Sequence, residues 1–107
     1  MPAVQRDLSL VVAHDVDAEQ LGDGVRAALG EHSEVVEAIE VRAETSYAAL
    51  SPSAVRRLGI EPDQKNVLLR VVLRAVDRTL THAECNVLRD EIYAALHRGT
   101  VSEWAAR

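Results

Sequence analysis

In this 107-residue chain, three arginines are placed so that their guanidinium groups could bind anions together. Arg70 and Arg74 fall on one face of an alternating segment, and Arg42 lies on another such segment. If the two segments pair as strands, the guanidinium groups share a sheet face and could contact the phosphates or bases of a nucleic acid. The alternative is that they are solvated and paired with Glu40 and Glu44 across the strands.

Two further arginines, Arg56 and Arg57, follow a Ser-Pro pair that predicts the start of a short helix over 52–58. From there they could reach RNA or another partner as outlying phosphate contacts. The alternative is an ordinary solvated helix face.

The overall charge limits what these arginines can do together. Lys and Arg number 12 against 17 Asp and Glu, which gives a net charge of -5. Strong sequence-independent binding of nucleic acid depends on cations that release counterions, so the acidic balance argues against it. A local basic patch remains compatible with this net charge. Whether one exists depends on how the basic residues are distributed over the fold.

The sequence shows no arrangement of residues that is typical of a catalytic site or a metal site. The four histidines show no metal-ligand spacing with one another or with Cys85, the single cysteine. Cys85 lies on the apolar stripe of a predicted helix, which favours a buried thiol over a nucleophile. We therefore expect no metal, no cofactor and no enzymatic activity of the isolated chain.

Composition indicates a soluble globular chain, with 48% hydrophobic and 27% charged residues. No apolar run reaches the roughly 18 residues of a membrane span, and no basic-then-apolar leader is present. We expect a cytoplasmic protein without a membrane partner, folded as one domain over residues 1–107.

Hydrophobic periodicity predicts the strands and helices on which the arginines lie. Alternation predicts strands over 6–13, 35–45 and 66–76. Capping boxes at Asp17–Gln20 and Thr81–Glu84 predict two helices, ended by Gly30 and Gly99. Residues 47–65 form a long insertion containing the short helix, and residues 100–107 could return as a fourth, edge strand.

This order predicts an α+β fold of the ferredoxin-like split βαβ type, an antiparallel sheet with two helices on one face. The other face should carry an aliphatic set: Val11, Leu68, Val72 and Val76. Such a face is usually covered, by a neighbouring domain, a second copy of the chain, or the 47–65 insertion with Leu50, Val55, Leu58 and Ile60.

Particular motifs carry a family resemblance across nearly the whole chain. They are Pro2-Ala3-Val4 with Arg6-Asp7-Leu8, the turn Arg78-Thr79-Leu80-Thr81 with Asn86 after it, and Lys65 before the third strand. With these motifs the chain resembles the ferredoxin-fold anticodon-binding domain at the C-terminus of the bacterial phenylalanyl-tRNA synthetase beta subunit. The resemblance implies contact with the anticodon stem-loop of phenylalanine tRNA and no part in the aminoacylation chemistry.

Two hypotheses follow. The first is a non-catalytic tRNA-binding domain that contacts RNA through the open sheet face and whose partners include tRNA and other synthetase domains. The second is a free-standing protein-interaction or homodimerisation module, because Arg42-Ala43-Glu44-Thr45 stands where the family carries Phe-Asp-x-Tyr. Unpaired bases favour aromatic stacking partners, which that segment lacks.

Overall fold

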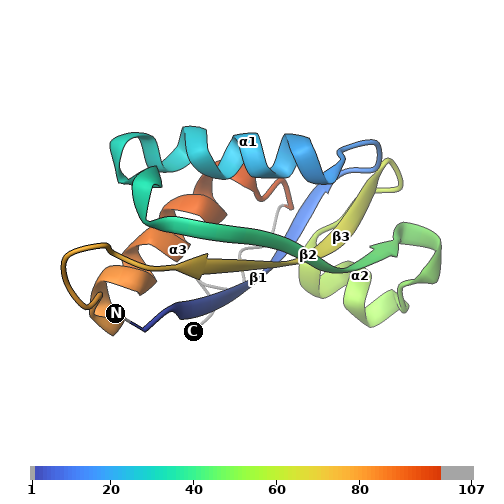
Figure 1. Ribbon diagram of the computed structural model, residues 1–107. Helices are drawn as coiled ribbons and strands as arrows, with labels where there is room; N and C mark the ends of the chain where they lie inside the picture. The colour runs from blue at the N-terminus through green and yellow to red at the C-terminus, as the bar shows by residue number, and fades with distance from the viewer. Residues whose placement is uncertain (1, 100–107) are drawn as a thin grey trace.

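The computed structural model describes residues 2–99, which form three strands and three α-helices (Figure 1). In chain order they are β1 (Val4–Ala13), α1 (Ala18–Leu29), β2 (Val36–Ser46), α2 (Pro52–Leu58), β3 (Gln64–Leu73) and α3 (His82–Leu96). Short 3-10 segments, η1 (Gly30–Val35) and η2 (Tyr47–Ala49), flank β2. The predicted fourth strand at 100–107 lies outside the described residues.

The sheet is antiparallel with the order β1-β3-β2, so β3 lies in the middle. Leu69 at its centre faces Leu8 on one side and Val41 on the other. Figure 1 shows α1 and α3 on one side of this sheet. The α+β, ferredoxin-like arrangement expected from the sequence is therefore confirmed.

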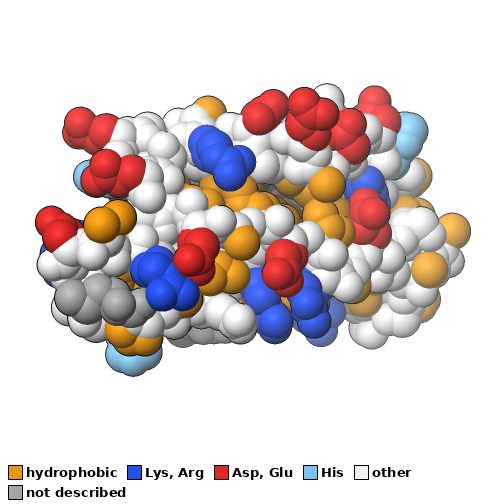
Figure 2. Space-filling model, viewed as in Figure 1, with side chains coloured by type: hydrophobic (Ala, Val, Ile, Leu, Met, Phe, Trp, Pro, Cys, Tyr) orange, Lys and Arg blue, Asp and Glu red, His pale blue; other side chains and the backbone are white. Residues whose placement is uncertain are grey.

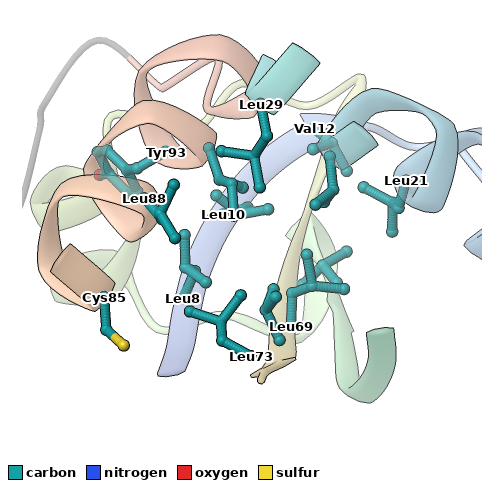
Figure 3. Packing of buried hydrophobic residues seen from close by; sticks show 14 of the residues in the cluster. Leu8, Leu10, Val12, Leu21, Leu29, Leu69, Leu73, Cys85, Leu88 and Tyr93 are labelled. Atoms are coloured by element: carbon teal, nitrogen blue, oxygen red, sulfur yellow. The ribbon is translucent and has the colours of Figure 1, made fainter. Parts of the chain in front are cut away.

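The main core lies between the sheet and these two helices (Figure 3). Leucine, valine and isoleucine dominate it, and Cys85 and Tyr93 of α3 are buried with them. A chain without phenylalanine builds this layer from the alternating strand positions, which include Leu8, Leu10 and Val12 of β1. The predicted buried thiol of Cys85 is confirmed.

A second, smaller core lies on the opposite face of the sheet. Val11 alternates with Leu10 and Val12, and it packs with Leu58 and Ile60 of the insertion. Tyr47, Leu50 and Val55 pack around these three. The insertion thus covers one end of the face that α1 and α3 leave open, which is one of the three expected covers.

Both capping boxes and the short helix form as predicted. Asp17 and Gln20 exchange side-chain and backbone hydrogen bonds of 2.8 and 3.0 Å, and Thr81 and Glu84 do the same at 3.1 Å. The α2 helix is capped by Ser51 and ends at Gly59, whose φ of 65° lies in the left-handed region. Gly59 has no Cβ to oppose that conformation.

The third strand and the last helix end earlier than predicted. The third strand ends at Leu73 and not at 76, because Leu73 pairs with the first residues of both neighbouring strands, Val4 and Val36. The last helix ends at Leu96, before Gly99. His97 adopts an extended backbone, and its Nδ1 accepts a hydrogen bond from the Val11 N–H while the Arg98 N–H donates to the Val11 carbonyl.

Candidate nucleic-acid interface

The open sheet face, as we call the face turned away from α1 and α3, is set by the register of β3. Arg70 lies directly between Asp7 of β1 and Glu40 of β2, and Leu68 lies between Ser9 and Ala43. Since side chains alternate along a strand, these positions point opposite to the buried Val67, Leu69 and Val71.

One ion pair on this face joins Arg70 to Asp7. The Arg70 Nε and Nη2 donate to the two Asp7 oxygens at 2.9 and 3.1 Å, a bidentate geometry. These hydrogen bonds hold the pKa of Asp7 below its usual value, with the charges of Arg70 and Arg42 acting in the same direction. The same pairing raises the pKa of Arg70.

Arg42 and Arg74 are also paired with carboxylates. Arg42 contacts Glu40, two residues away on the same strand, at 3.1 Å. Arg74 follows β3 and contacts Glu37 at 2.9 Å. In Figure 2 the Lys and Arg side chains below β2 lie beside Asp and Glu side chains, so this face carries mixed charge.

One predicted partner is wrong. Glu44 does not pair with a face arginine, because β2 has register shifts between Val36 and Ala38 and again between Val41 and Ala43. After the second shift, Glu44 lies opposite the buried Val67 and forms an ion pair with Lys65 at 2.5 Å. Strict alternation would place Glu40 and Glu44 on one face of β2, and the second shift breaks that alternation.

Arg56 and Arg57 lie exposed in the last turn of α2. The helix that carries them is anchored by Leu58, which is buried against Val11. The structure therefore places these two arginines on the insertion, on a segment held against the open-face side of the sheet, and not on the strands themselves.

The sequence interpretation missed Tyr47, which directly follows β2. Tyr47 is half-buried against the smaller core and lines an open cavity of about 620 Å³ together with His14, Thr45 and Lys65. The sequence does contain a signal for it, since Tyr47 stands two positions after Arg42-Ala43-Glu44-Thr45, the segment in which the family carries aromatic residues. Lys65 is fixed there by donating to the Val16 carbonyl at 2.7 Å.

Two motif residues act within the fold. The Arg6 Nε donates to the Asn86 side chain at 3.0 Å, and its Nη2 lies 3.1 Å from His82 Nδ1, which ties β1 to α3. Arg78 pairs with the Glu84 carboxylate at 2.6 Å, which ties the β3–α3 turn to the first turn of α3. Thr81 and Arg78 together hold the pKa of Glu84 below its usual value.

Within residues 2–99, no group of three or more His, Cys, Asp or Glu side chains is arranged to hold a metal ion. Burial raises the pKa of the Cys85 thiol, which disfavours the reactive thiolate. In the same part of the chain, no helix has the length and apolarity needed to cross a membrane.

The strand order and the helix layer define a ferredoxin-like α+β domain. The chain belongs to the ferredoxin-fold anticodon-binding domain family, which it matches over residues 1–103. It is 37% identical over 88 residues to the phenylalanine–tRNA ligase beta subunit of Corynebacterium efficiens. That match covers 82% of this chain and 9% of the relative's length. The family resemblance read from the sequence motifs is confirmed.

Proposed function

We propose that this chain binds the anticodon stem-loop of a tRNA, with phenylalanine tRNA as the preferred species, in a non-catalytic recognition role. The observation that carries the proposal is the family match over residues 1–103. The relative named as a phenylalanine–tRNA ligase beta subunit supplies the amino-acid identity and the expectation of synthetase domains as neighbours. A part in protein synthesis would place the chain, folded as one domain over 1–107, in the cytoplasm.

The RNA surface that we propose combines the open sheet face with the cavity beside Tyr47. Arg42, Arg70 and Arg74 would contact phosphates by exchanging their carboxylate partners for phosphate oxygens. Guanidinium groups suit both partners because the fork of N–H donors fits either geometry. The competing carboxylates make each contact weaker than that of a free arginine. Binding should still depend on salt, because arginines that contact phosphates release condensed counterions.

Tyr47 would offer its ring edge or face to an unpaired base at the rim of the cavity. Stacking on an aromatic ring is worth roughly 1–3 kcal/mol per base and tolerates any base. Arg56 and Arg57, on the insertion, would contact phosphates further along the stem.

Fluorescence anisotropy of a labelled phenylalanine tRNA anticodon stem-loop tests the proposal, with a scrambled loop as the specificity control. We expect binding that prefers the cognate loop and weakens steeply as salt rises from about 50 to 200 mM. Arg70→Gln should weaken it, whereas Arg26→Gln, the same charge change on α1, should not. Absence of binding at the lowest salt would overturn the proposal.

A second candidate function is a protein-interaction or homodimerisation module that uses the same face. The pairing of all three face arginines with carboxylates favours it, as does Leu68, whose residue is 37% exposed in the middle of that face. Sedimentation velocity separates the two functions: a concentration-dependent dimer that Leu68→Ser abolishes would support the second.

A further inference from the structure

A different surface, at the turn between β3 and α3, carries an apolar groove with acidic edges. One cavity of about 260 Å³ lies between η1 and the first turns of α3, with Val35, Leu80, Val87 and Leu88 in its lining. Leu80 and Leu88 are buried and form the floor, whereas Val87 is 56% exposed. We call this cavity and the one beside it the η1–α3 groove.

The adjoining cavity extends the groove along the turn. It has a volume of about 280 Å³ and shares Glu34, Val35 and Arg78 with the first, and it adds Val76. Val76 is 95% exposed. Among residues 2–99, the large hydrophobic side chains that are exposed are Leu68, Val76 and Val87, and two of these three line this groove. Exposed apolar side chains gathered at one groove mark an interaction site more than isolated ones do.

The charges around the groove are predominantly negative. Glu84 is neutralised by Arg78, but Glu34, Glu91 and Asp77 have no cationic partner within residues 2–99. In Figure 2, Asp and Glu side chains gather at the end of the molecule where Figure 1 shows the β3–α3 turn, around hydrophobic side chains. An occupant with cations on either side of an apolar group would complement both features.

We propose that the η1–α3 groove docks a segment of a partner protein in which an aliphatic side chain is flanked by Lys or Arg. The aliphatic side chain would fill the space over Leu80 and Leu88, and the cations would pair with Glu34, Glu91 and Asp77. RNA is disfavoured because its phosphates would meet these carboxylates.

The groove lies apart from the insertion that carries α2. Figure 1 shows the β3–α3 turn and α2 at opposite ends of the molecule. A protein bound at the turn therefore leaves Arg56 and Arg57 of α2 accessible, and this inference stands whether or not the chain binds RNA.

A random dodecapeptide library displayed on phage, panned against the whole chain, tests the inference. We expect enriched peptides with one aliphatic residue flanked by Lys or Arg. Val87→Ser and Glu91→Lys should each weaken the best peptide by about fivefold or more, the loss typical of an interface anchor. Leu68→Ser, the matched removal of an exposed aliphatic side chain elsewhere, should leave its Kd unchanged.

Three outcomes would overturn the inference. They are a library that yields no enrichment, enriched peptides that lack the aliphatic-basic pattern, and peptide binding indifferent to both groove variants. A labelled anticodon stem-loop titrated against the same variants separates RNA from protein. Loss of stem-loop affinity in Val87→Ser, without peptide binding, would assign the groove to RNA and not to a protein segment.

Discussion

The Arg70 guanidinium and the Asp7 carboxylate face each other across β1 and β3 and are joined by two hydrogen bonds. The pair fixes the arginine side chain over the open sheet face and, at the same time, offers an intramolecular competitor for any phosphate. Asp7 therefore both orients the Arg70 side chain and competes with phosphate for it. Replacing Asp7 and Arg70 one at a time separates the two effects.

Removing the competitor should strengthen RNA binding. Asp7→Asn leaves a side chain of the same shape but releases Arg70 from its ion pair, so the stem-loop should bind more tightly than to the wild type. Arg70→Gln should bind more weakly and reduce the slope of log affinity against log salt by about one. Anisotropy titrations at several salt concentrations measure both effects. Equal affinity in wild type and Asp7→Asn would remove Arg70 from the interface.

The same pair predicts how stability depends on pH. The pKa of Asp7 is lowered in the folded protein, so its ionised form stabilises the fold above the ordinary carboxyl range, near pH 4. This contribution is lost as pH falls through the lowered pKa. Because the pair is substantially exposed, its contribution to stability should be small. Urea midpoints of wild type and Asp7→Asn should differ at pH 7 and converge at the acid end.

The smaller core should hold α2 in place. Leu58 is 1% exposed and packs against Val11, so Leu58→Ala should cost about 2–5 kcal/mol of unfolding free energy. Arg56→Ala, two residues earlier on the exposed side, should change it by no more than about 0.5 kcal/mol. Chemical denaturation measures both variants, and similar midpoints for the two would contradict this packing.

Two glycines of α1 should respond differently to alanine. A Cβ at Gly22 would lie 3.3 Å from the mobile end of Arg26, so Gly22→Ala should stabilise the helix by about 0.5–1 kcal/mol. A Cβ at Gly24 would lie 2.6 Å from Leu96 Cδ2, which forces Leu96 to shift. Gly24→Ala should therefore unfold at a lower urea concentration than Gly22→Ala. Identical midpoints would show that α1 and α3 are further apart than described.

The His97 side chain should protect the Val11 N–H of β1 from hydrogen exchange. Its Nδ1 accepts from the buried Val11 N–H at 3.0 Å, and its ring stacks on Tyr93 with centroids 4.5 Å apart. His97→Ala leaves that N–H without its acceptor, at a cost of about 1–3 kcal/mol, and should speed its hydrogen exchange. His97→Asn places an amide near the same position and should restore part of the protection. Unchanged exchange in His97→Ala would contradict the contact.

Local signals predicted the element types well, because caps and alternation act over a few residues. Asp17, Thr81 and Ser51 start their helices as their side chains dictate. Strand ends and side-chain faces depend on the neighbouring strand: Leu73 ends β3 because its partners begin there, and Glu44 changes face because β2 is shifted against β3. The sequence therefore located Arg42 and Arg70 on their strands and named Glu40 as a carboxylate partner, but it did not identify Asp7 as the partner of Arg70, since Asp7 lies 63 residues away.

The two register shifts in β2 have a consequence beyond the placement of Glu44. In the described sheet β2 is an edge strand of 11 residues, long enough to present a row of unpaired backbone groups to another chain. Irregularities and charged side chains both disrupt a straight template for strand addition. Glu37, Glu40 and Arg42 lie along this edge. We therefore expect it to resist the edge-to-edge strand pairing between molecules that leads to aggregation.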